Sequence, residues 1–208
     1  MTSRRKIFAF RPARWWLGAE NLFWERRLMI RTRVAYAPDE SYDDGAEHFA
    51  YEPTAYRVIM AVLRRLELTE SDVFVVLGCG MGRVVCSAAR RGVARVLGVE
   101  DMAGLCDIAR WNAQHMRSPH SPITIIHGRA EEFDFTQGTA FYWFNPFGPA
   151  TLRRILDAME SGIRRNPRPL RIAYVNPLFG ATLRATGWLE RYDRWRSAHM
   201  VSLWRTRC

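Results

Sequence analysis

The stretch VVLGCGMGRV, residues 75–84, decides the fold of this chain, because three glycines at alternate positions directly follow an apolar run. A strand that ends in a glycine turn and continues into a helix typically bends its backbone around a nucleotide. A dinucleotide fingerprint would place its third glycine at Arg83, whereas the glycines here are Gly78, Gly80 and Gly82. The spacing G-x-G-x-G therefore disfavours a dinucleotide and leaves the nucleotide open.

Apolar strand patterns alternate with helical patterns on both sides of this turn. The predicted strands span 72–78, 93–100, 122–128, 139–145 and 169–176. Most are apolar on both faces, which is typical of a parallel sheet covered by helices on both sides. Beyond residue 187, WLERYDRWR and HMVSLWRT alternate apolar and polar residues, which predicts an antiparallel hairpin. The sequence thus predicts an α/β, doubly wound, Rossmann-like fold with a mostly parallel seven-stranded sheet, a C-terminal hairpin, and its ligand at the carboxyl ends of the strands.

The chain divides into a basic, aromatic extension over residues 1–50 and one α/β domain over residues 51–208. In the extension a helix is expected from about Glu20, with its aromatic side chains packed on the domain. A second helix should begin near Thr54, which follows Pro53 and would cap it. Further helices are predicted over 82–92, 103–116 and 150–165. No cofactor motif lies in residues 1–33, so we expect that segment to act in substrate capture.

The net charge of +10 is concentrated at the two ends of the chain. Residues 1–33 hold nine basic and two acidic residues, and residues 151–208 hold twelve and four. Such asymmetry is typical of a surface for nucleic acid or another polyanion. The alternative is a coding bias, because Lys6 is the only lysine among 31 basic residues.

No segment approaches the roughly 18 uncharged apolar residues of a membrane helix, so no membrane partner is expected. The four cysteines form no CxxC pair, which favours reduced thiols and a cytoplasmic protein. The five histidines lack ligand spacing such as HxxxH, so no metal site is expected.

Two features downstream of the turn fit a nucleoside. Glu100 lies 22 residues after Gly78, at the tip of the next predicted strand, where a carboxylate accepts hydrogen bonds from both ribose hydroxyls. The following strand ends in GRAEEF, which places Ala130 and Glu131 where an adenine would lie. Taken alone, GRAEEF also fits a polar loop with Phe133 buried beneath it.

The stretch FYWFNPFGP, residues 141–149, points to an acceptor site. Asn145 and Pro146 fall where a strand should end, so the Asn145 side-chain oxygen and neighbouring carbonyls would face the cleft beside Phe147. Two acceptors near an aromatic face can hold an amine and leave its lone pair directed at a methyl donor. The alternative is a strand-terminating Asn-Pro turn with an aromatic cover.

The motifs LGCGMGR, GVE, GRAEEF and FNPF, in this order, resemble class I S-adenosylmethionine (SAM) dependent methyltransferases over residues 51–180. YEPTAY before the first strand narrows the resemblance to the non-SET histone-lysine (Dot1-like) methyltransferase family and its bacterial relatives. The resemblance implies SAM as cofactor, and it implies the site residues. These are Tyr51, Glu52 and Thr54 enclosing the cofactor, Gly78, Gly80 and Gly82 beside its methionine part, Glu100 on the ribose, Ala130 and Glu131 near the adenine, and Asn145 and Phe147 with Tyr51 at methyl transfer.

The expected function is therefore N-methylation of an amine, either a protein lysine or a small molecule. Phe147, Tyr51 and Trp143 would desolvate the amine and lower its pKa, so no dedicated base is required. The nucleosome-binding parts of the eukaryotic enzymes are not recognisable here, and N-P-F differs from the N-P-P-Y pattern of nucleobase methyltransferases. One alternative is a nucleic-acid methyltransferase whose arginine-rich ends hold phosphates. Another is a SAM-binding or polyanion-binding module without catalysis.

Overall fold

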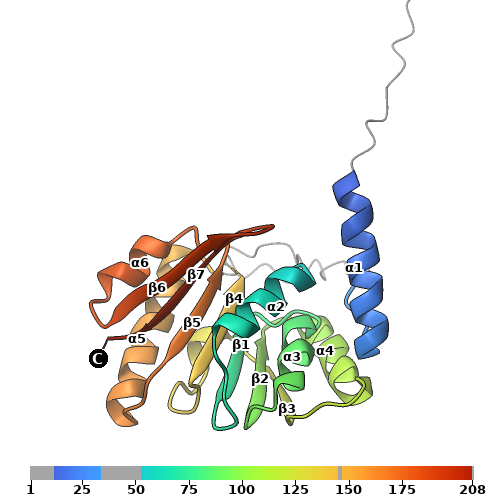
Figure 1. Cartoon of the computed structure of the whole chain (residues 1–208). Helices are drawn as coiled ribbons and strands as arrows, with labels where there is room; N and C mark the ends of the chain where they lie inside the picture. Colours follow the sequence, from blue (N-terminus) through green and yellow to red (C-terminus); the bar gives the residue numbers. More distant parts are fainter. Residues whose placement is uncertain (1–11, 34–52, 145–146, 208) are drawn as a thin grey trace, which may run out of the picture.

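The computed structural model describes residues 12–33, 53–144 and 147–207. One seven-stranded sheet has the strand order β3-β2-β1-β4-β5-β7-β6 (Figure 1). The first five strands are parallel, and β7 is antiparallel to β5 and β6. The strands are β1 (Val73–Leu77), β2 (Arg95–Glu100), β3 (Ile123–His127), β4 (Ala140–Phe144), β5 (Arg171–Val175), β6 (Leu189–Arg196) and β7 (Met200–Thr206). This architecture confirms the predicted fold class, hairpin included.

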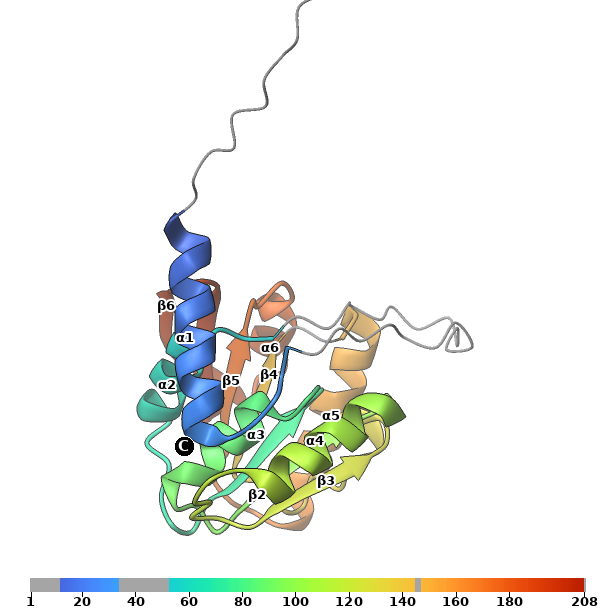
Figure 2. The ribbon, with the colours of Figure 1, turned by 90° about the vertical axis from the view of Figure 1, so that its right-hand side faces the viewer.

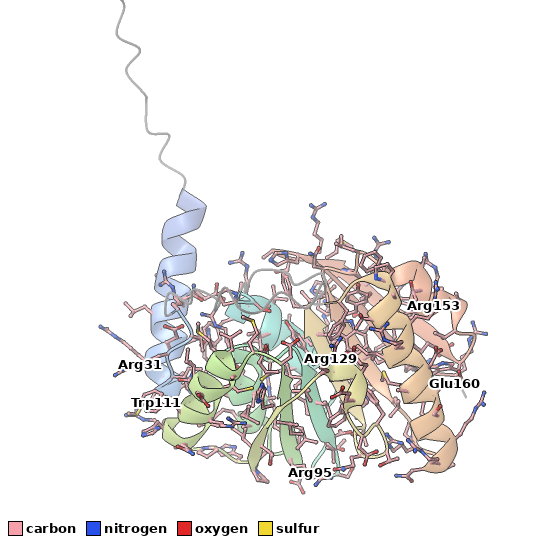
Figure 3. The ribbon with its side chains drawn as sticks, turned by 180° about the vertical axis from the view of Figure 1, so that it is seen from behind. Arg31, Arg95, Trp111, Arg129, Arg153 and Glu160 are labelled. Atoms are coloured by element: carbon pink, nitrogen blue, oxygen red, sulfur yellow. The ribbon has the colours of Figure 1, made fainter. Side chains whose placement is uncertain are left out.

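Helices cover both faces of the sheet. α2 and α3 lie in front of it in Figure 1, whereas α5 faces the viewer in Figure 3. The helices are α1 (Pro12–Leu28), α2 (Tyr56–Arg65), α3 (Arg83–Ala88), α4 (Ala103–His115), α5 (Pro149–Arg165) and α6 (Gly180–Ala185), with the 3-10 turns η1 (Ala89–Arg91) and η2 (Ala130–Glu132). Each sheet face has its own apolar cluster, one beneath α2 and α3 and the other beneath α5 and α6.

The amphipathic pattern of α2 is confirmed, but its predicted start is wrong. Val58, Ile59, Val62 and Leu63 are all buried, as their i, i+3, i+4 spacing requires. The helix begins at Tyr56 after Ala55, and no side chain caps it. Thr54 does not cap the helix because its hydroxyl shares a 2.8 Å hydrogen bond with the hydroxyl of Tyr142 on β4.

The extension contains a longer helix than predicted, since α1 begins at Pro12 and not near Glu20. Trp24 stacks on Tyr56 of α2 with 5.8 Å between ring centroids, which confirms for this residue the predicted packing on the domain. Phe23 is 58% exposed and does not pack in that way. Figure 2 shows α1 beside α2, with its amino-terminal half extending past the sheet.

Three cysteines, Cys79, Cys86 and Cys106, are free and buried, and Cys208 lies outside the described residues. Burial raises the pKa of the Cys86 thiol to about 12, so this thiol stays protonated and unreactive at neutral pH. Within residues 12–33, 53–144 and 147–207, no helix is both long and apolar enough to cross a bilayer.

Candidate functional site

The glycine turn joins β1 to α3 and rests on the end of β2. Its three glycines all have positive φ, namely Gly78 (69°), Gly80 (54°) and Gly82 (83°). The Val99 carbonyl of β2 accepts hydrogen bonds of 2.9 Å from the N–H groups of both Gly78 and Cys79. Gly98 permits this close approach, because a Cβ there would lie 2.9 Å from the Cys79 sulfur. Left-handed backbone favours glycine, which has no Cβ, so the chain can make this tight turn at little steric cost.

Glu100 is the last residue of β2, and its carboxylate contacts the turn directly. One oxygen, Oε2, accepts a 2.8 Å hydrogen bond from the Gly80 N–H, and Oε1 accepts one of 3.2 Å from the Met102 N–H. The residue is only 6% exposed, and burial raises the pKa of its carboxyl to about 7 despite these two donors. A carboxylate can accept more than these two hydrogen bonds, so further hydroxyl donors would stabilise the ionised form of Glu100.

The segment after β3 forms the neighbouring side of this edge, since Glu100 and His127 are partners in the β2–β3 ladder. Ala130 is buried at the start of η2. Glu131 accepts hydrogen bonds from Arg129 at 3.1 Å and from Arg154 at 3.3 Å. Burial opposes ionisation of Glu131, but its backbone bond and the two arginines bring its pKa below the usual value. The Glu131 carboxylate is thus held charged beside η2.

The end of β4 lies next to the glycine turn, because Val76 and Tyr142 are partners in the β1–β4 ladder. Asn145, predicted to orient the acceptor, lies outside the described residues. Phe147 is half-buried and packs against the apolar cluster beneath α5. The predicted role of Trp143 is wrong: it is fully buried, with its ring centroid 5.7 Å from that of Tyr174 on β5. Side chains alternate along a strand, and Trp143 points into the core beneath α5.

The segment ahead of α2 is fixed to β4 and to the start of α3. The Thr54 hydroxyl bonds Tyr142, and the Thr54 carbonyl accepts a 3.1 Å hydrogen bond from Arg83 Nη1. Thr54 is buried by these contacts. Tyr51 and Glu52, which precede it, lie outside the described residues.

The structure adds residues that sequence reasoning missed. In the sequence Arg83 stands only where a dinucleotide fingerprint would have a glycine, yet its side chain is buried at the start of α3. Asn112 of α4 donates a 2.8 Å hydrogen bond to the Met81 carbonyl inside the turn. His199 lies against Phe144 at the end of β4, with 4.7 Å between ring centroids. The one signal in the sequence is that Arg83 stands in the apolar run GRVVCSAA, where burial is expected. The contacts of Asn112 and His199 join residues far apart in sequence and leave no such signal.

This arrangement fits a nucleoside-bearing methyl donor. Glu100 offers carboxylate oxygens beside the glycine turn, and both lie at the carboxyl edge where doubly wound sheets bind ligands. Within the described ranges, no three His, Cys, Asp or Glu side chains gather into a group that could hold a metal ion.

Comparisons with known proteins agree with this geometry. A family model described as "Histone methylation protein DOT1" matches residues 36–138. No curated protein matches the sequence. Among solved structures, an RNA methyltransferase from Salinibacter ruber in complex with S-adenosyl-L-homocysteine (SAH) is 20% identical at a TM-score of 0.57, covering 74% of this chain and 92% of that one. A SAM-dependent O-methyltransferase from Thermotoga maritima is 15% identical at a TM-score of 0.59, covering 76% and 68%.

A magnesium protoporphyrin IX methyltransferase from Synechocystis with bound SAM is 12% identical at a TM-score of 0.57, and the match covers 96% of this chain and 98% of that one. At identities of 12–20%, the three structures establish the fold alone. The family match supports methyltransferase activity. The chain is a class I SAM-dependent methyltransferase that resembles the Dot1-like histone methylation family.

Proposed function

We propose that this methyltransferase is an N-methyltransferase whose acceptor is an amine, either a protein lysine or a small molecule. The observation that carries the proposal is the adjacency of the glycine turn and the β4 end, where Val76 pairs with Tyr142 three residues before Asn145. The end of β4, which the Asn-Pro-Phe motif follows directly in sequence, and the proposed donor site therefore share one edge of the sheet. We also propose a cytoplasmic location, which the free buried thiols support.

The family resemblance, together with the described residues at this edge, supports the following roles. Gly78, Gly80 and Gly82 would hold the methionine part of SAM, and Glu100 its ribose. Ala130 and Glu131 would flank the adenine. Thr54 would anchor the segment that carries Tyr51 and Glu52 over the cofactor. Asn145 and Phe147, with Tyr51, would orient the acceptor amine.

When bound, SAM supplies a methyl group already activated by its sulfonium, so the chain has mainly to align the acceptor. The nitrogen must arrive with a free lone pair. The Phe147 ring would favour the neutral amine by desolvation, since burial disfavours the charged form. The Asn145 side-chain oxygen would accept an N–H of that amine and fix the direction of its lone pair. The proton is lost to solvent before methyl transfer.

A specific observation supports a second candidate, a nucleic-acid methyltransferase. Arg31 and Trp111 lie close together (Figure 3), with the Arg31 guanidinium carbon 5.0 Å from the centroid of the Trp111 ring. Trp111 is 38% exposed. Arg26 and Arg27 are exposed on α1 close by in sequence. Exposed aromatic and arginine side chains are features of nucleic-acid surfaces. A steep decrease of acceptor binding with salt would favour this candidate.

Labelling of a cell extract with tritiated SAM tests the proposal. Label in protein or in small-molecule amines supports it, with the Asn145→Ala variant as a control that should transfer little. Label in RNA or DNA favours the second candidate. Binding of SAM without label in any fraction would point to a non-catalytic SAM-binding module.

A further inference from the structure

Arg83 has a buried guanidinium next to the cofactor turn. It is the first residue of α3, it follows Gly82 directly, and it is 3% exposed. A buried cation requires hydrogen-bond acceptors and opposite charge around it, because leaving water is costly. The side chains that accept its hydrogen bonds come from α1 and the segment after it, outside the α/β domain.

The guanidinium forms a closed ring of hydrogen bonds with Thr32 and Glu25. Arg83 Nε donates to Thr32 Oγ1 at 2.7 Å, and Nη2 donates to Glu25 Oε1 at 3.0 Å. Thr32 completes the ring by donating its hydroxyl proton to the same Glu25 oxygen at 2.7 Å. Arg83 Nη1 donates to Asn21 Oδ1 at 3.0 Å, and the guanidinium carbon lies 4.6 Å from the Tyr56 ring centroid.

These partners connect three segments to one side chain. Asn21 and Glu25 belong to α1, and Thr32 follows that helix. The fourth acceptor is the Thr54 carbonyl, which belongs to the segment proposed to enclose the cofactor. Arg83 is therefore the point at which α1 and the enclosing segment both meet the glycine turn.

A second contact joins the same stretch to the turn. Asn112 Nδ2 donates to the Met81 carbonyl at 2.8 Å and to the Arg31 carbonyl at 2.9 Å. Its Oδ1 accepts the Arg31 N–H at 2.7 Å. The backbone after α1 is thus tied through a buried amide to the turn residue between Gly80 and Gly82.

We propose that Arg83 is a positioning residue that makes SAM affinity depend on the docking of α1. If α1 leaves the domain, Arg83 loses Asn21, Glu25 and Thr32 together, and its guanidinium must rotate toward water. That movement would release the Thr54 carbonyl and disturb the backbone beside Gly82. The inference rests on SAM binding but not on the identity of the methyl acceptor.

Matched variants test this coupling. Glu25→Gln keeps the size and an acceptor oxygen but removes the charge that faces Arg83. Arg57→Gln is the control, because Arg57 forms the exposed 3.3 Å ion pair with Glu20 on the same helix and is 46% exposed. We expect Glu25→Gln to weaken SAM binding at least about fivefold in calorimetry, and Arg57→Gln to change it by less than about twofold.

Hydrogen exchange distinguishes this coupling from a purely structural role of the Arg83 contacts, which would not make exchange over α1 depend on the cofactor. Linkage is reciprocal, so SAH binding to the wild-type protein should slow exchange over α1, and this effect should be smaller in Glu25→Gln. Wild-type SAM affinity in Glu25→Gln with a faster-exchanging α1 would overturn the proposal. The proposal would also be overturned if the loss of SAM affinity in Glu25→Gln were fully explained by the fraction of that variant that is unfolded.

If Glu25→Gln fails to fold, Thr32→Val is the milder variant, since it removes only the bridging hydroxyl. It should weaken SAM binding in the same direction, and unchanged affinity together with unchanged α1 exchange would also refute the coupling. Wild-type protein that binds SAM but methylates nothing would contradict the proposed function alone. The Arg83 coupling would then still be decided by the binding data.

Discussion

If Glu100 binds the ribose, its buried carboxylate should make SAM binding sensitive to pH near neutrality. Burial raises its pKa to about 7 from the model-compound value of 4.5, which corresponds to about 3 kcal/mol against the ionised form. Because the pKa of an acid is raised on folding, the free energy of unfolding should fall as pH rises from about 4.5 through 7. Ribose hydroxyls donate hydrogen bonds and would stabilise the ionised form, so bound SAM should offset that loss.

The magnitude follows from this titration. With a pKa of about 7 in the free protein and a much lower one in the complex, affinity should fall by about tenfold between pH 8 and pH 6. Glu100→Gln removes the titration and should flatten the profile. At pH 8 the same variant should bind SAM about 1 to 3 kcal/mol more weakly, because hydrogen bonds to a charged acceptor are lost.

Calorimetry at several pH values measures both effects. The difference between the wild-type and Glu100→Gln profiles cancels the titration of SAM itself, which carries its own amino group. Glu160→Gln on α5 is the matched control, since Glu160 pairs with Arg164 on an exposed helix surface. Equal pH slopes in wild-type and Glu100→Gln protein would refute the ribose assignment, as would unchanged affinity at pH 8.

Three further predictions concern other parts of the chain. Asn145→Ala should lower kcat by roughly a hundredfold with little change in SAM affinity, whereas a lower melting temperature with normal kcat would leave FNPF as a turn. Removal of residues 1–33 should weaken SAM binding measured by calorimetry, because Arg83 then loses Asn21, Glu25 and Thr32. Undiminished affinity in the folded remainder would instead support a role of this segment in substrate capture alone. Asp72→Asn should destabilise the fold by about 3 kcal/mol in urea unfolding, since hydrogen bonds from Arg171 and Thr139 outweigh burial and lower the pKa of Asp72. The stabilisation by Asp72 should decrease as pH falls from about 4 through its lowered pKa, and a flat acid profile would contradict it.

Much of the fold could be predicted because its signals are local. The five parallel strands end within two residues of their predicted bounds, and the hairpin alternates as expected. Short elements escaped prediction: α6 has six residues and η2 three, too few to show a period. The start of α2 was misplaced because the Thr54 hydroxyl bonds Tyr142, 88 residues away, and does not cap the helix.

By itself, the sequence determined the class of the protein. The apolar runs and the alternating glycines dictate a strand, a turn and a helix through backbone sterics and burial, and Glu100 falls at a fixed distance beyond them. Tertiary structure alone decided what surrounds that turn. Arg83 looked like a misplaced residue in the sequence, yet folding brings Glu25 to its guanidinium from 58 positions away. Such pairs leave no periodic trace, because the partners of a buried charge are chosen by three-dimensional packing and by the cost of leaving that charge unpaired.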